Sequence, residues 1–475
     1  MGLVASFLVN SLANFALGLL LAFFLGPGAF GLYAVVVAGA GALASPAIDW
    51  VRHAATRFYS DGTRAHDPGV RATLDATVAG LVGGLGLIGL LLPALGPALT
   101  GDPVVATLAL AFCTLSALFD YGSALARARF LERAYARLVI LRNGLMLVLM
   151  TGTAALTRDP SAVLAAGIVA LGACLALGRG DLRDPDARWA LARRDLVRGF
   201  ALYGVPLMAA GGFAMLQAFY NRAAVAATFG LAEAGKFALA YDIGVRIVAV
   251  TATALDVLLF QLAVRADARE GRDAAVARVG RNLAIVLAVL LPTAVGYGLV
   301  IRSFEAVFVP AAYRGAYAAY SLALLPGLTA WALMQFGLSP AFQIRGRTLP
   351  MLVPNAAALA GTVVVGTVLA EVMGPIGHAV AFSASMLAAL ALTAVMVSRQ
   401  APVPVSWRTV LSTFAALVAM AAAVLALSGS EPSLAALAAG VVSGGAAYAV
   451  AVLALDVAGA RRALLARLRR ERDPA

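Results

Sequence analysis

Four polar side chains share one face of an otherwise apolar stretch, residues 237–262, and have the clearest capacity for chemistry in this chain. They are Asp242, Arg246, Thr253 and Asp256. In a helix, with about 100° between residues, they lie within an arc of about 80°. Charges inside a membrane helix are costly, so this face is expected either to line a hydrated cavity or to fix helix packing through an Asp242–Arg246 ion pair. Asp256 has no basic partner on its own helix, which favours a cavity with a titratable carboxylate.

A second polar group ends the preceding apolar stretch, residues 200–221. Gln217 and Asn221 are one helical turn apart and share a face, and Arg222 follows directly. Amides can bind sugar hydroxyls, and a guanidinium can bind a phosphate through paired hydrogen bonds. The alternative for Arg222 is that its side chain reaches out to the outer lipid headgroups.

Other polar or small residues inside apolar stretches have simpler interpretations. Asn14 and Asn143 are expected either to face a cavity or to form hydrogen bonds between helices. The pair Gly440-x-x-x-Gly444 predicts a close helix contact.

Patterns of catalysis or metal binding are missing from the sequence. The three histidines are scattered and form no ligand motif, and the two cysteines lie within apolar stretches. Gly84-x-Gly86-x-x-Gly89 has dinucleotide-site spacing, but no strand precedes it. We therefore predict no enzyme activity, no metal site and no cofactor.

Fourteen apolar stretches are long enough to cross a membrane as helices, which takes about 20 residues for about 30 Å of hydrocarbon. They span roughly residues 3–25, 29–50, 75–95, 104–126, 138–157, 160–178, 200–221, 237–262, 283–301, 316–337, 350–370, 375–397, 409–427 and 433–456. Composition agrees, because 62% of the residues are hydrophobic and only 13% are charged, against about 25% charged in soluble domains. The sequence predicts an all-α polytopic membrane protein.

Basic residues lie almost entirely on one side of the predicted membrane. The even-numbered connections and the C-terminal tail hold 30 of the 36 Lys and Arg, the odd-numbered connections hold 5, and Arg246 lies within a span. Cytoplasmic loops keep Lys and Arg, so both termini are predicted to be cytoplasmic. The net charge of +12 is explained by these loops and by attraction to anionic lipid, and does not indicate nucleic acid.

An internal duplication is indicated at a nearly constant offset. Gly26, Gly31, Tyr33 and Ala34 match Gly230, Gly235, Phe237 and Ala238 at 204 residues, and Phe130, Arg133 and Asn143 match Phe342, Arg345 and Asn355 at 212. Odd-numbered spans match odd ones, so the repeats are parallel, an arrangement known in transporters. We predict two six-helix bundles (1–178 and 200–400) joined by a cytoplasmic linker (179–199), then two further membrane helices (401–460) and a basic cytoplasmic tail (461–475).

Five short motifs follow one another between residues 3 and 400. They are Leu25-Gly26-Pro27-x-x-Phe30-Gly31-Leu32-Tyr33-Ala34, Arg127-Ala-Arg-Phe130-Leu-Glu-Arg133-Ala134, Tyr203-Gly204-Val-Pro206, Ala234-Gly235-Lys-Phe237-Ala-Leu-Ala240-Tyr241, and Gln343-x-x-Gly346-Arg347 with Asn355 and Gly374-x-x-Gly377-His-Ala379. In order and spacing they resemble the polysaccharide transporters of the multidrug/oligosaccharidyl-lipid/polysaccharide exporter (MOP) superfamily. Members often place an Arg before the Leu-Gly-Pro, whereas this chain has Phe23-Phe24 there.

The resemblance implies a flippase of the bacterial inner membrane. Its cargo would be a polyprenyl diphosphate-linked oligosaccharide for lipopolysaccharide O-antigen or exopolysaccharide, moved by alternating access. A polysaccharide polymerase, glycosyltransferases and membrane lipids are the expected partners. Two alternatives stay open: an ion-coupled drug/cation antiporter of the same superfamily, and a membrane-embedded polysaccharide polymerase or ligase.

The charge bias makes a topology prediction. A reporter that is active only outside the cytoplasm is expected to be silent when fused at Ala190 or Ala475, and active when fused near Thr100 or Glu431. Activity at Ala475 would contradict the fourteen-span count.

Overall fold

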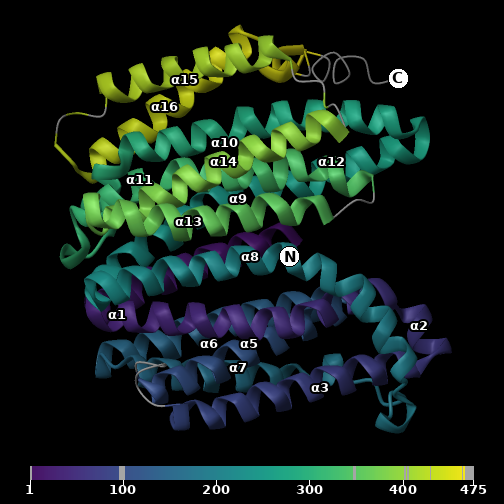
Figure 1. The fold of residues 1–475 in the computed structure, drawn as a ribbon. Helices are drawn as coiled ribbons and strands as arrows, with labels where there is room; N and C mark the ends of the chain where they lie inside the picture. The colour runs from purple at the N-terminus through teal and green to yellow at the C-terminus, as the bar shows by residue number, and fades with distance from the viewer. Residues whose placement is uncertain are drawn as a thin grey trace. The chain divides into compact units, whose positions relative to one another are not determined.

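The computed structural model describes residues 3–95, 102–345, 349–400, 406–427 and 431–462, together with Val403, Gly429, Leu464 and Leu465. At 3–9, 95, 210, 253, 254 and 256–258 it describes the backbone alone. Its regular elements in this part of the chain are all helices (Figure 1). They form two compact units, Met1–Leu239 and Ala240–Ala475.

The first unit contains six long helices and the start of a seventh. Its elements are α1 (Leu3–Phe58), α2 (Asp61–His66), α3 (Pro68–Leu91), η1 (Leu92–Leu95), α5 (Pro103–Ala128), α6 (Glu132–Thr157), α7 (Pro160–Leu182), η2 (Trp189–Leu191), α8 (Arg194–Phe229) and the first turns of α9 (Leu231–Glu270). The boundary between the two compact units falls within α9, so all of α8 belongs to the first unit. The predicted boundaries at 178 and 200 rest on the internal repeat instead, and stay a prediction.

An Asp-Pro pair starts three of these helices. Asp102 Oδ1 accepts from the backbone N–H groups of Val104 and Val105 at 3.0 and 3.2 Å, and Pro103 follows at the first helical position. Asp67 and Asp159 start α3 and α7 in the same way. The carboxylate satisfies N–H groups that have no partner within the helix, and proline there has no N–H to satisfy.

Helix α1 is two membrane spans joined at a break. Gly26 has φ 71° and ψ 172°, outside the helical region, and Pro27 follows it. The apolar part, Asn10–Phe58, has 49 residues, or about 70 Å of helix at 1.5 Å per residue. That is about twice the 30 Å of a bilayer's hydrocarbon, so each arm crosses once.

The number of spans agrees with the sequence. Eleven of the described helices are long and apolar enough to cross a membrane, or twelve when the two arms of α8 count as one. Dividing α1 at Gly26 and adding α9, which has 40 residues and is not among the twelve, gives the fourteen that were predicted. The prediction of an all-α polytopic membrane protein is confirmed.

The second unit contains the rest of α9 and the C-terminal helices. These are α10 (Arg272–Phe308), η3 (Ala311–Tyr313), α11 (Ala316–Ala332), η4 (Leu333–Leu338), α12 (Ser339–Ile344), η5 (Leu349–Met351), α13 (Leu352–Met373), α14 (Ile376–Gln400), α15 (Trp407–Leu427), α16 (Leu434–Ala454) and η6 (Val457–Gly459). The predicted span 316–337 thus consists of α11 and a π-helical segment, η4, with α12 continuing it. Ser339 Oγ donates to the carbonyl of Met334 at 2.8 Å at this irregularity.

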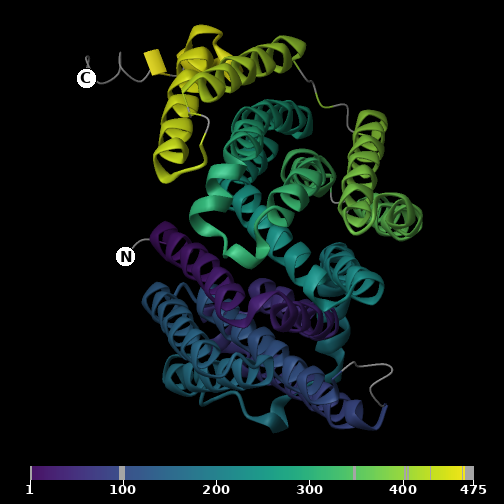
Figure 2. The same cartoon turned by 90° about the vertical axis from the view of Figure 1, so that its left-hand side faces the viewer.

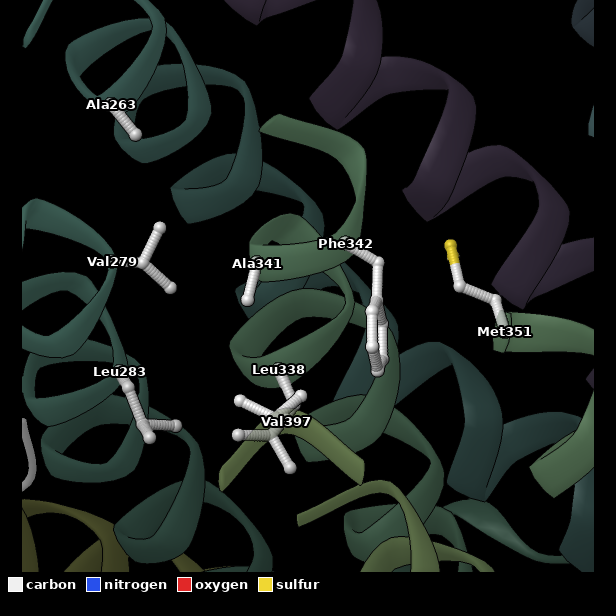
Figure 3. Close-up of a cluster of buried hydrophobic side chains, with 8 residues drawn as sticks. All are labelled: Ala263, Val279, Leu283, Leu338, Ala341, Phe342, Met351 and Val397. Atoms are coloured by element: carbon white, nitrogen blue, oxygen red, sulfur yellow. The ribbon is translucent and has the colours of Figure 1, made fainter. Parts of the chain in front are cut away.

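Apolar side chains from α9, α10, α12 and α14 meet in the core of this unit, where Phe342 is 1% exposed (Figure 3). The C-terminal hairpin of α15 and α16, yellow in Figure 2, packs on α10 through a second apolar cluster. Met420 and Val424 of α15 and Leu437 of α16 contribute to it.

The two repeated glycine junctions have the same conformation. Gly230, between α8 and α9, has φ 87° and ψ 167°, close to the values at Gly26. They also meet reciprocally within the first unit. A Cβ on Gly31 would lie 1.8 Å from the carbonyl oxygen of Leu231, and a Cβ on Gly235 would lie 2.1 Å from that of Pro27. The offset of 204 relates both pairs, as expected for a duplication.

Alanine at either contacting glycine is expected to destabilise the protein. Gly31→Ala and Gly235→Ala each push a methyl group into a backbone carbonyl, and overpacking of this kind costs about 1–3 kcal/mol. Gly28 is the matched control, since nothing lies within 4 Å of its Cβ position. Thermal midpoints of the purified protein in detergent should fall for the first two variants and stay unchanged or rise for Gly28→Ala. Equal midpoints for all three would contradict the contact.

Candidate transport site

Three asparagines from α1 and α6 form a cluster within the first unit. Asn143 Nδ2 donates to Asn10 Oδ1 at 3.0 Å, and Asn14 Nδ2 donates to Asn10 Oδ1 and to Asn143 Oδ1 at 3.1 and 3.4 Å. The structure thus brings Asn14 and Asn143 together. Asn10 was missed by sequence reasoning, although its position four residues before Asn14 places both on one helix face.

This geometry is that of hydrogen bonding between helices. Each amide has a partner on the other helix or one turn away, and hydrogen bonds of this kind contribute about 0.6–1.7 kcal/mol in membrane proteins. Asn143 is 6% exposed. The cluster therefore fixes α6 against the first arm of α1.

The polar end of α8 is buried. Gln217, Asn221 and Arg222 are 2%, 0% and 8% exposed, whereas an arginine that reaches to headgroups would keep its guanidinium in solvent. Neither amide atom of Asn221 has a hydrogen-bond partner within the described part of the chain. A buried amide without a hydrogen-bond partner lowers the stability of the fold by about 1–3 kcal/mol. A polar ligand or a water molecule that bonds to it would remove this cost. The role of these three residues in binding cargo stays a prediction.

The charged face of α9 points away from α11. The Cβ position of Gly244 lies 2.7 Å from Leu328 of α11, so this side of α9 packs against that helix. Asp242 and Arg246, two residues to either side, are each about 160° around the helix from Gly244. Both are partly buried. Whether the face lines a cavity stays a prediction, and the side chain of Asp256 lies outside the described residues.

Arg142 on α6 was also missed by sequence reasoning. Its guanidinium lies 3.4 Å from Asp120 of α5, donates to Ser116 Oγ at 2.9 Å and stacks 4.7 Å from the centroid of the Phe119 ring. Asp120 is one of several carboxylates of this unit that pair with arginine.

An apolar cavity of about 520 Å³ lies between α10, α15 and α16. Gly296, Gly440, Gly444 and Gly445 line part of it, and the missing side chains make the room. Gly444 also contacts α15, since its Cβ position is 2.6 Å from Val424, as the glycine spacing predicted. Tyr448, in the wall, donates its hydroxyl to the carbonyl of Ala288 at 2.6 Å. No lining side chain is charged, so the cavity suits a hydrocarbon chain.

Within the described residues, no group of three or more His, Cys, Asp or Glu could hold a metal ion.

The chain matches no family model and no curated protein sequence. Solved structures do share its fold. The lipid II flippase MurJ in an inward closed conformation has a TM-score of 0.72 at 11% identity, over 95% of this chain and 98% of that one.

Two transporters of the MOP superfamily share the fold over a smaller part of the chain. An inward-facing multidrug resistance transporter of the MATE family has a TM-score of 0.60 at 16% identity, over 81% of this chain and 92% of that one. A transporter from Pyrococcus furiosus, described as having a binding pocket of reversed polarity, has a TM-score of 0.58 at 14% identity, over 82% and 92%. The chain therefore has the fold of the MOP superfamily, which its sequence motifs had predicted.

Proposed function

We propose that this protein is a flippase that moves a lipid-linked oligosaccharide, carried on a polyprenyl diphosphate, from the cytoplasmic to the outer leaflet of a bacterial inner membrane. The extent of the likeness to the lipid II flippase carries this proposal. Only 5% of the chain, or about 24 residues, has no counterpart in that structure, which is fewer than the 42 residues of α15 and α16. Part of the C-terminal hairpin therefore belongs to the shared fold. The MATE transporter covers only 81% of the chain.

The apolar cavity beside that hairpin supports a lipid-linked cargo. A prenyl chain has no polar groups, so it needs a groove without charges and without unsatisfied hydrogen-bonding atoms. The glycines of α16 supply such a groove next to α10. The tail would remain in an apolar environment while the polar head crosses.

The diphosphate-sugar head needs cations and amides. Arg246 of α9 and Arg222 of α8 are the basic groups that we assign to the diphosphate, and Gln217 and Asn221 are the amides that we assign to sugar hydroxyls. Asp256 is assigned to coupling or gating. The sequence has no phosphate-binding loop for ATP, so an ion gradient or consumption of the product supplies direction. A polymerase and glycosyltransferases for lipopolysaccharide or exopolysaccharide would act before and after this step.

A drug/cation antiporter is the second candidate, because the fold likeness to a MATE transporter favours it. A cation cargo needs carboxylates that are not neutralised by arginine. In the first unit Asp75, Asp120 and Asp49 each lie within 3.4 Å of an arginine guanidinium. That pairing favours an anionic cargo.

The charged face of α9 provides the main test. Arg246→Ala should abolish surface glycan at normal protein levels, and Arg246→Lys should restore part of it, since Lys keeps the charge without the bidentate fork. Arg302→Ala, at an exposed position of α10, removes the same charge and should export normally. Surface glycan and membrane protein are measured in the same cells. Full export by a stably expressed Arg246→Ala variant would leave this residue a packing role.

Filling the apolar cavity tests the lipid tail. A Cβ on Gly445 meets nothing within 4 Å, so Gly445→Leu should occupy the cavity without a backbone clash and reduce glycan export several-fold. Gly84→Leu, on an exposed and equally open position of α3, is the control. A drug antiporter would instead lose drug resistance and leave glycan export unchanged in both variants.

A further inference from the structure

A second cavity, of about 340 Å³, lies at the predicted cytoplasmic end of the first unit. Its lining residues come from α3, α5, α7 and the connection that follows α7. Arg71 is four residues into α3, and Arg179 is three residues from the end of α7. These positions are at the level of lipid headgroups, because both helices cross the hydrocarbon on the other side of them. The cavity is separate from the residues assigned to cargo.

Hydrogen bonds between helices hold one wall of this cavity together. Arg71 is 7% exposed, donates from Nε to Asp75 Oδ2 at 2.8 Å and from Nη2 to the carbonyl of Leu182 at 3.2 Å. Tyr121 donates its hydroxyl to the other oxygen of Asp75 at 2.7 Å. These bonds join α3, α5 and the end of α7, so the wall is formed before any ligand arrives.

The connection after α7 is fixed to the same place. Asp184 lines the cavity and accepts from the Tyr59 hydroxyl at 2.9 Å, and Arg64 lies 3.3 Å from its other oxygen. Burial and the hydrogen bond to Asp184 raise the pKa of Tyr59, so the phenol keeps its proton at neutral pH. Both carboxylates of the cavity are therefore already neutralised by Arg71 and Arg64.

Two further arginines line the cavity and carry the excess positive charge. Arg179 and Arg183 are exposed, and neither belongs to an ion pair within the described part of the chain. The lining also contains four leucines from α5 and α7: Leu118, Leu125, Leu175 and Leu182. A ligand that matches both parts has an anionic group attached to a hydrocarbon chain.

We propose that this cavity binds the phosphate group of an anionic phospholipid from the cytoplasmic leaflet. Arg179 and Arg183 bind the phosphate oxygens, and the leucines contact the first part of the acyl chain. Free phosphate would satisfy the arginines but would leave the leucines without a partner. The bound lipid would join α7 and its connection to α3, and so stabilise the first unit.

The test uses the full-length protein in a neutral detergent, titrated with a short-chain phosphatidylglycerol, with phosphatidylcholine or with inorganic phosphate. Phosphatidylglycerol should raise the thermal midpoint of the wild type, and the other two should leave it unchanged. In Arg179→Gln/Arg183→Gln the half-saturating concentration of phosphatidylglycerol should rise about tenfold or more. The matched control is Arg188→Gln/Arg194→Gln, two exposed arginines, in the same connection and at the start of α8, that do not line the cavity.

Each other result overturns the proposal. An equal loss in the control variant would mean diffuse attraction between charges, and an unchanged titration of the cavity variant would mean that these arginines bind no lipid. A shift with inorganic phosphate at the same concentration would make this a site for a free anion. If the glutamine variant is unstable, Arg179→Lys/Arg183→Lys decides, since it keeps both charges and should weaken binding without abolishing it.

Discussion

Hydrocarbon offers no hydrogen-bond partner, and this constraint determines most of the molecule. Every backbone N–H and C=O that crosses the bilayer must be satisfied within the protein, which leaves helices as the element for a chain of this composition. The same constraint acts where helices start and break. Asp67, Asp102 and Asp159 satisfy the N–H groups at three helix starts, and each break at Gly26 and Gly230 lies where one helix ends and the next begins.

Polar side chains obey the same constraint and so report on function. Asparagines of α1 and α6 bond to one another, and Asp120 pairs with Arg142. Such groups are satisfied by the fold. Asn221 differs, because it is buried and its amide has no partner within the described chain. A group of this kind costs stability in the absence of a partner, and this is the observation behind our proposal that Asn221 binds the cargo.

The helices were predictable from sequence, because apolar length is a strong signal, and α5, α7 and α15 begin within two residues of their predicted positions. Cytoplasmic ends were less predictable. Helices such as α8 and α10 continue well into charged sequence, where backbone hydrogen bonding persists although the hydropathy falls.

The site residues were less predictable than the helices. Asn14 and Asn143 bond to each other, but they lie on different helices, α1 and α6, and spacing in the sequence gives no distance between helices. For the same reason the sequence did not show that Tyr121 of α5 bonds to Asp75 of α3.

The reciprocal glycine contact has a consequence for how this chain can change over time. At Gly31 and Gly235 the neighbouring atom is a main-chain carbonyl oxygen, not a side chain. A clash caused by a larger residue at either position therefore cannot be relieved by a substitution in the opposite helix, since every amino acid carries the same carbonyl. Second-site suppressors cannot arise there by exchange of side chains. In the predicted duplication, the two copies could therefore differ in charge, length and cargo groups, while the contact requires glycine at each of these two positions separately.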